Sequence, residues 1–129
     1  MKVVGNTIIQ PFHKASCHCG AVEYEFRDTP EWATECNCSI CRRLGTLWIY
    51  SDISNVVINA APDATLKYVQ GNKPIAIHGC RTCGCTTHWE NLTAGETRMA
   101  VNLRLAEPET ISSIPVRHFD GADKWEFLD

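Results

Sequence analysis

The sequence predicts a mainly β fold of antiparallel sheets, braced by metal and containing one short helix. Short runs alternate apolar with polar residues, as in residues 21–27, where Val22, Tyr24 and Phe26 share one face. No window sustains the 3.6-residue period of an amphipathic helix. The eight cysteines fall in three tight groups, which is typical of metal ligands in a small domain.

Runs that favour strands recur along the chain, each bounded by the Gly, Pro, Asn or Asp residues that favour turns. We expect strands at residues 21–27, 47–51, 56–59, 66–70, 74–78, 86–90, 97–105 and 116–119. The single helix is expected at residues 39–44, because Ser39 stands in the N-cap position and Gly45 can end the helix. Residues 59–65 and 106–114 are expected to be loops.

Composition sets the class of protein. The chain has 129 residues, 44% apolar and 21% charged, which is enough for one buried core, so residues 1–129 are expected to form a single domain. The net charge is −3, without the basic face that nucleic-acid binding normally requires. No apolar run approaches the ~18 residues of a membrane span, and the first residues do not form a secretory signal. We therefore expect a cytoplasmic protein that binds neither nucleic acid nor membrane.

Two pairs of cysteines predict a closed metal site. Because cytoplasmic thiols stay reduced, metal binding is favoured over disulfides. Cys17 with Cys19, and Cys80 with Cys83, lie about sixty residues apart, each pair at the end of a predicted strand. Four sulfurs complete a tetrahedral zinc site of the structural kind, whose binding energy contributes to folding. The alternative is a set of unpaired buried thiols.

The third group holds three cysteines within six residues: Cys36, Cys38 and Cys41. Catalytic zinc sites use three protein ligands and leave the fourth position open for a substrate. A thiol that binds there would lose its proton and become a nucleophile. The alternative is a second closed site with Cys85 as its fourth ligand, although Cys85 lies only two residues beyond Cys83.

The five histidines have ordinary structural interpretations beside functional ones. His18 lies between two proposed ligands and is expected to project into solvent. His78 and His88 fall in predicted strands, which favours buried and hydrogen-bonded side chains over a role in proton transfer. His13 and His118 carry no signal beyond composition.

Two arginines and two aromatic residues follow the three-cysteine group. Arg42 and Arg43 are candidates to hold a substrate carboxylate, or else are solvated cations at a helix end. Trp48 and Tyr50 are expected to be core residues of a strand, with a pocket wall as the alternative.

The cysteine motifs in this order resemble the glutathione-dependent formaldehyde-activating enzyme family, which includes the centromere protein V domain. The resemblance extends over residues 16–125 and is carried by SCHCGAV at 16–22, CNCSICRRLG at 36–45, LKY at 66–68 and CRTCG at 80–84. It implies a β-tent fold with a structural zinc on the four paired cysteines and a labile catalytic zinc on Cys36, Cys38 and Cys41. It further implies a carbon–sulfur lyase that forms S-hydroxymethylglutathione from formaldehyde and glutathione.

The chain departs from the family pattern at two places. Ile77-His78-Gly79 stands where an arginine and an aromatic residue are common, and Cys85 stands where a small hydroxyl residue is frequent. These departures affect the expected substrate and leave both expected metal sites in place. The alternatives to an enzyme of this family are a zinc-stabilised binding module without catalytic activity and, less favoured, a methionine sulfoxide reductase that would use Cys85.

Overall fold

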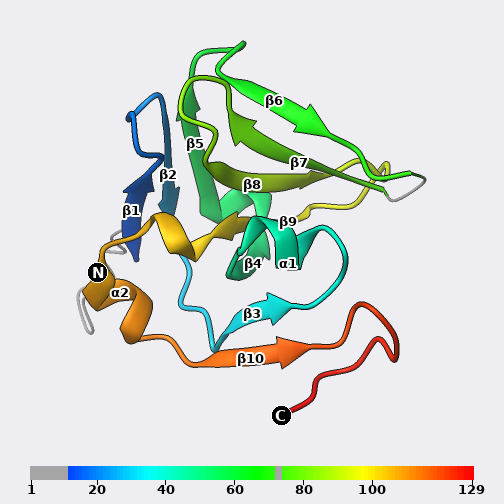
Figure 1. Ribbon diagram of the computed structural model, residues 1–129. Coiled ribbons are helices and arrows are strands. Elements are labelled where there is room, and N and C mark those ends of the chain that lie inside the picture. Colours follow the sequence, from blue (N-terminus) through cyan, green and yellow to red (C-terminus); the bar gives the residue numbers. More distant parts are fainter. Residues whose placement is uncertain (1–11, 72–73) are drawn as a thin grey trace.

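The computed structural model describes residues 12–71 and 74–129 and confirms a mainly β fold with two sheets and a few short helices (Figure 1). The strands of this part are β1 (His13–Ser16), β2 (Val22–Phe26), β3 (Ala33–Cys36), β4 (Trp48–Asp52), β5 (Val56–Ala60), β6 (Thr65–Tyr68), β7 (Ile75–Cys80), β8 (Thr86–Asn91), β9 (Arg98–Asn102) and β10 (Val116–Phe119). The helical elements of the same residues are α1 (Cys41–Leu44), α2 (Pro108–Ser112) and the 3-10 turns η1 (Ile53–Asn55) and η2 (Leu103–Leu105).

The smaller sheet has three antiparallel strands in the order β1-β2-β5. Its central strand confirms the alternation seen in the sequence, because Val22, Tyr24 and Phe26 are buried while the glutamates between them are half-buried. β1 was not expected, since its sequence HKAS has no apolar alternation.

The larger sheet has seven strands in the order β10-β3-β4-β9-β8-β7-β6. Its neighbours are antiparallel except for β10 and β3, which are parallel, with Val116 opposite Ala33 and Phe119 opposite Cys36. The expectation of purely antiparallel sheets is therefore wrong for this one pair. The two strands are far apart in the sequence, which leaves ample chain for the crossover that a parallel pair needs.

The short helices differ in two ways from the expected pattern. The N-cap of α1 is Ile40 rather than Ser39, and the side chain of Ile40 makes no capping hydrogen bond. The N–H of Cys41 is directed instead at Cys38 Sγ, at 3.4 Å. Gly45 ends the helix as expected, in the left-handed conformation. A second helix, α2, forms inside the expected loop 106–114, where Pro108 occupies the first turn.

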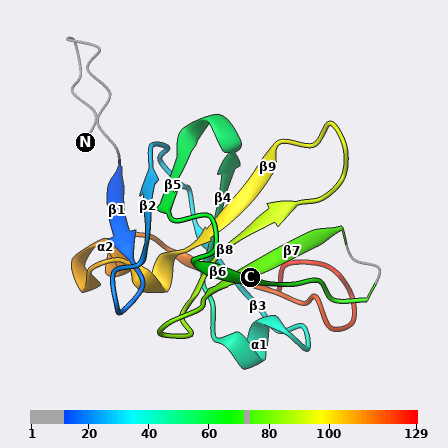
Figure 2. The same ribbon diagram turned by 90° about the horizontal axis from the view of Figure 1, so that it is seen from above.

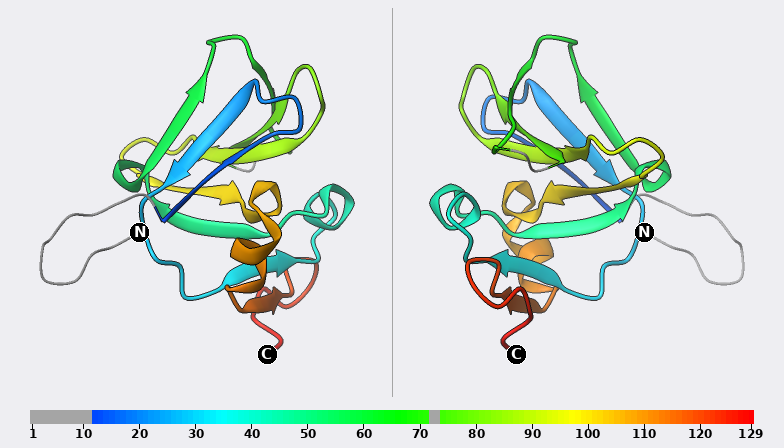
Figure 3. Two further views of the ribbon diagram at one scale, coloured as in Figure 1. Left: turned by 90° about the vertical axis from the view of Figure 1, so that its left-hand side faces the viewer. Right: turned by 90° about the vertical axis from the view of Figure 1, so that its right-hand side faces the viewer.

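The hydrophobic core lies between the two sheets. Tyr24 and Phe26 of β2 pack against Ile49 of β4 and Val101 of β9, and all four side chains are at most 1% exposed. Figures 2 and 3 show the strands β1, β2 and β5 grouped on one side of β4 and β9. Within the described residues no helix is long and apolar enough to cross a membrane.

Candidate functional site

The two cysteine pairs meet in the structure. The turn between β1 and β2 contains Cys17 and Cys19. Strand β7 ends at Cys80, and the turn that follows it contains Cys83. Their four sulfur atoms all lie within 4.8 Å of one another. The sequence prediction that these four residues form one cluster is therefore confirmed.

The geometry of the four-cysteine cluster fits a tetrahedral ion. Ligands 2.3 Å from a tetrahedral zinc lie about 3.8 Å apart, and the sulfur of Cys19 lies 3.7 Å from that of Cys17 and 3.6 Å from that of Cys80. Backbone N–H groups point at the sulfurs, that of Val22 at Cys17 Sγ over 3.3 Å and that of Cys83 at Cys80 Sγ over 3.5 Å. Such donors stabilise thiolates, which are the metal-binding form.

The four-cysteine cluster joins the two sheets. Cys17 follows β1 of the smaller sheet, whereas Cys80 ends β7 of the larger one. Both sulfur-bearing residues are buried, at 2% and 3% exposure. An ion held here would therefore connect the two sheets through two turns that lie about sixty residues apart in the sequence.

Cys85 belongs to this cluster's surroundings and not to the three-cysteine group. It packs with Cys17, Val22 and Cys80, and its backbone N–H lowers the pKa of Cys83 to about 5. The N–H of His18 favours the thiolate of Cys85, but burial and neighbouring sulfurs raise the pKa of Cys85 overall. The alternative in which Cys85 completes the second site is thus wrong in this structure.

The three remaining cysteines form a second cluster. Cys36 ends β3, Cys38 lies in the following turn and Cys41 begins α1, with the three sulfurs within 4.8 Å of one another. The N–H of Cys38 is directed at Cys36 Sγ over 3.5 Å, and the N–H of Cys41 at Cys38 Sγ. Among the described residues no fourth His, Cys, Asp or Glu joins them.

The sulfurs of the second cluster shift one another's pKa. The thiol of Cys41 donates to the sulfur of Cys36, which lowers the pKa of Cys36 to about 5 and raises the pKa of Cys41. Where several sulfurs compete for protons, a metal cation can take the place of those protons. The donor set of this cluster therefore fits a metal ion with three thiolate ligands.

Residues outside the three-cysteine segment complete the surroundings of the second cluster. The indole N–H of Trp48 donates to Cys41 Sγ over 3.4 Å. Gly121 lies so close that a Cβ there would be 2.6 Å from Cys36 Sγ. Asn37 ties the turn to the C-terminal segment, donating to Asp120 at 3.1 Å and accepting from the N–H of Ala122 at 3.0 Å. The sequence placed Trp48 on a strand, but it did not predict any of these contacts.

A cavity of about 490 Å³ borders the second cluster, and it is called the polar cavity below because charged side chains are among its lining residues. Cys36 and Cys41 line it together with Asn37, Arg42 and residues of β3 and β10. The guanidinium of Arg42 makes no ion pair within the part of the chain that the structure describes. Arg43, the other candidate, instead donates to the carbonyl of Ser39 at 2.7 Å.

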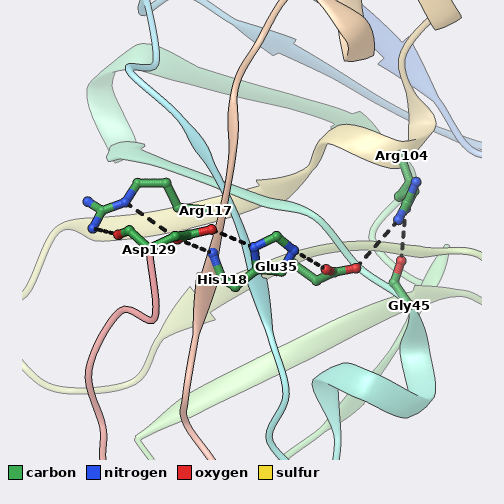
Figure 4. Close-up of polar contacts among 6 residues, drawn as sticks. All are labelled: Glu35, Gly45, Arg104, Arg117, His118 and Asp129. Atoms are coloured by element: carbon green, nitrogen blue, oxygen red, sulfur yellow. Dashed lines mark hydrogen bonds and ion pairs between the residues drawn. The ribbon is translucent and has the colours of Figure 1, made fainter.

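Charged side chains that line this cavity, among them Glu35, His118 and Asp129, form a chain of polar contacts (Figure 4). His118 lies between Asp129 and Glu35, with its Nδ1 2.7 Å from one carboxylate and its Nε2 3.0 Å from the other. The bond to Asp129, with the nearby charge of Glu35, raises the pKa of His118. Arg104 extends the chain through an ion pair with Glu35 at 4.0 Å, and it also donates to the carbonyl of Gly45 at 3.1 Å.

A second, apolar cavity of about 510 Å³ borders the same cluster. Cys36, Cys41 and Phe119 line both cavities, so the cluster is in contact with each of them. Its aromatic walls come from four segments of the chain: Trp48 and Tyr50 of β4, Trp89 of β8, Phe119 of β10, and Trp125 and Phe127 beyond it.

The two aromatic residues after the cysteines lie on a strand and also line the apolar cavity, Trp48 as a buried side chain and Tyr50 as a half-buried one. Trp48 is 2% exposed, and Tyr50, whose pKa burial raises, lies under the guanidinium of Arg98 at 4.4 Å. Tyr50 also contacts Trp89 edge to face at 6.2 Å.

The histidines lie outside both clusters. His18 is exposed, as expected. His78 and His88 stack at 4.2 Å on neighbouring strands, and His78 bonds Thr65 and Glu90 at 2.8 Å each. Burial lowers the pKa of His88 to about 4. The interpretation of these two residues as hydrogen-bonded core histidines is confirmed.

Comparison with known proteins places these features in a family. Residues 12–116 match the family of the glutathione-dependent formaldehyde-activating enzyme, and the chain belongs to that family. The crystal structure of a Rhodobacter sphaeroides protein aligns with a TM-score of 0.65 and 28% sequence identity, covering 81% of this chain and 99% of that chain. No curated protein matches the sequence.

Proposed function

We propose that this protein is a zinc-dependent carbon–sulfur lyase that forms or cleaves the adduct of a small thiol and an aldehyde. The observation that carries the proposal is the place of Cys36 and Cys41, which border two cavities, one lined by several charged side chains and the other walled by aromatic rings. A thiol–aldehyde adduct has two halves that meet at sulfur and carbon. A centre between two cavities has the shape that such a molecule requires.

Zinc is the metal that fits both clusters, because all-sulfur sites without redox chemistry are typical of it. Cys17, Cys19, Cys80 and Cys83 would hold a structural ion, and Cys36, Cys38 and Cys41 a catalytic one. When bound at the second cluster, zinc lowers the pKa of a coordinated thiol and so supplies a thiolate near neutral pH.

The chain's own residues orient the thiol substrate. Glutathione carries two carboxylates, and the guanidinium of Arg42 in the polar cavity, which pairs with no carboxylate of the described residues, can hold one of them with two N–H donors. The N–H of Trp48 and the backbone N–H groups around the cluster stabilise negative charge on the cysteine sulfurs. Strong charge on those three ligands keeps an added thiol exchangeable, which suits release of the product.

Formaldehyde and glutathione are the substrates that family membership suggests in general terms. In the forward direction the sulfur of glutathione attacks the carbonyl carbon, a C–S bond forms and the carbonyl oxygen takes up the proton that the thiol has lost. The product is S-hydroxymethylglutathione. We place this reaction in the cytoplasm, where glutathione is abundant and the cysteines stay reduced.

Calorimetry on the zinc-loaded protein tests the proposal. Glutathione should bind through sulfur and release a proton near neutral pH, whereas S-methylglutathione, whose blocked sulfur cannot become a thiolate, should bind at least tenfold more weakly. Arg42→Ala should weaken glutathione binding, while Arg81→Ala, an exposed arginine beside the four-cysteine cluster, serves as the matched control. Equal affinity for the two ligands would favour a zinc-stabilised binding module without thiol activation.

A further inference from the structure

The apolar cavity is larger than a one-carbon aldehyde requires. Its volume of about 510 Å³ falls in the range of cavities that hold whole drug-sized ligands. Apart from its oxygen, the carbon of formaldehyde bears only hydrogen atoms. Formaldehyde would therefore leave most of the aromatic walls without contact. Apolar surface in such a cavity stabilises a complex only when the ligand also brings apolar surface.

The walls of this cavity have a regular origin in the strands. Trp48 and Tyr50 are two positions apart on β4, as are Ile75 and Ile77 on β7, so each pair faces the same side of the sheet. The residues between them, Ile49 and Ala76, face the other side and are fully buried. The cavity is therefore part of the sheet's design and not a gap between loops.

Contacts among the wall residues hold the cavity open. Trp48 is fixed by its bond to Cys41 Sγ, and Tyr50 lies between Trp89 and the guanidinium of Arg98. Phe119 contacts Trp125 and Phe127 edge to face, each at 5.0 Å. Because these rings are held by one another, they provide a preformed surface for a flat or branched apolar group.

We infer that the aldehyde substrate carries an apolar substituent, aromatic or branched aliphatic, that occupies this cavity beside Cys36 and Cys41. The inference rests on the proposed function and narrows its substrate class. The thiol's sulfur forms a bond to the carbonyl carbon, the C=O double bond becomes a C–O single bond, and the oxygen gains the thiol's proton. No oxidant or reductant is needed, and the substituent stays in the apolar cavity while the thiol's charged groups stay in the polar one.

Competition between aldehydes tests this inference. With glutathione as the thiol, kcat/KM for phenylacetaldehyde should exceed that for acetaldehyde by on the order of 10- to 100-fold, the effect of burying one phenyl group. Trp89→Ala should reduce this preference at least fivefold, and Ile75→Phe, which fills the cavity, should do the same. Tyr68→Ala removes an exposed aromatic side chain that lines neither cavity, and it should keep the preference.

Binding of an unreactive probe separates the cavity from the chemistry. In saturation-transfer NMR, 2-phenylethanol should receive magnetisation from the wild type, and Trp89→Ala should lose the signal while Tyr68→Ala keeps it. Conversion of formaldehyde with glutathione, combined with no phenyl preference and no probe binding, would overturn this inference and leave the proposed function intact. Probe binding without conversion of any aldehyde would contradict the proposed function and show a cavity that serves another reaction.

Discussion

The four-cysteine cluster takes its ligands from two turns of different sheets, with Cys19 and Cys80 separated by 61 positions, whereas the three-cysteine cluster takes all its ligands from one six-residue segment. The ligand atoms are identical. An ion in the first cluster would close a long loop of chain and so would contribute to folding, while an ion in the second would close almost none; the second cluster borders two cavities. Topology and access, rather than ligand chemistry, therefore separate a structural role from a reactive one.

The largest expected effect is on the four-cysteine cluster. Cys80→Ser should lower the free energy of unfolding by several kcal/mol, ~3 or more, because the ion that joins the sheets is lost. Denaturant unfolding followed by circular dichroism measures this change. Cys85→Ser is the matched control, because Cys85 lies in the same turn but outside the cluster, and it should cost much less. Equal effects of the two substitutions would break the comparison.

The buried histidine pair should give the next largest effect, through pH. The folded state holds the pKa of His88 at about 4, below the ordinary 6.5, so the neutral form is favoured by folding. This contribution is present above pH 6.5 and is lost as the pH falls toward 4, amounting to about 2 kcal/mol between pH 7 and pH 5.

A difference measurement isolates this histidine from acid effects on the cysteines. The stability gap between the wild type and His88→Gln should narrow by about 2 kcal/mol from pH 7 to pH 5, because the variant lacks the titrating group. A constant gap for His88→Gln would show that His88 does not resist protonation in the folded state.

A smaller effect on stability is expected at the three-cysteine cluster. Cys38→Ser should change the free energy of unfolding by ~1 kcal/mol or less while the protein loses one of two bound zinc ions, because the cluster closes only a local turn. Metal analysis of the folded variant checks both statements together. An insoluble or unfolded variant would assign this cluster a structural role and remove the contrast.

The last and smallest expected effect is on the zinc affinity of the second cluster, and it comes from Trp48. Trp48→Phe keeps the aromatic ring but removes the N–H that bonds Cys41 Sγ, so the second cluster should bind zinc about tenfold more weakly, as is typical when a ligand loses its supporting hydrogen bond. Competition with a chromophoric chelator measures this affinity. Trp89→Phe changes a ring of the same cavity that bonds no sulfur, and equal losses for both variants would exclude the N–H as the cause.

Local patterns were sufficient to predict the members of the two cysteine clusters and most strands. The cysteine pairs and their glycines are readable because a turn and its sulfurs lie within a few residues, as at Cys80 and Gly84. The period of two in Trp48 and Tyr50 could also have predicted a shared face, but it does not say whether that face meets a core or a cavity.

The rest depends on contacts between distant segments. The parallel pairing of β10 with β3 and the close approach of Gly121 to Cys36 leave no local signal, because each partner is about eighty residues away in sequence. β3, with sequence ATEC, lacks the alternation that identifies a strand, and tertiary pairing determines its conformation. The polar cavity was missed for the same reason, since His118 gains its carboxylate partners only when these strands pair.

Zinc counting during mild chelation tests the contrast between the two clusters most directly. The purified protein should contain two zinc ions per chain, and a chelator should remove one of them quickly while the circular dichroism spectrum and the unfolding transition stay nearly unchanged. Glutathione should protect this ion, since it adds a thiolate at the same centre. The second ion should leave only as the protein unfolds. Loss of both ions in one step together with the fold, or a single tightly held ion from the start, would contradict the account.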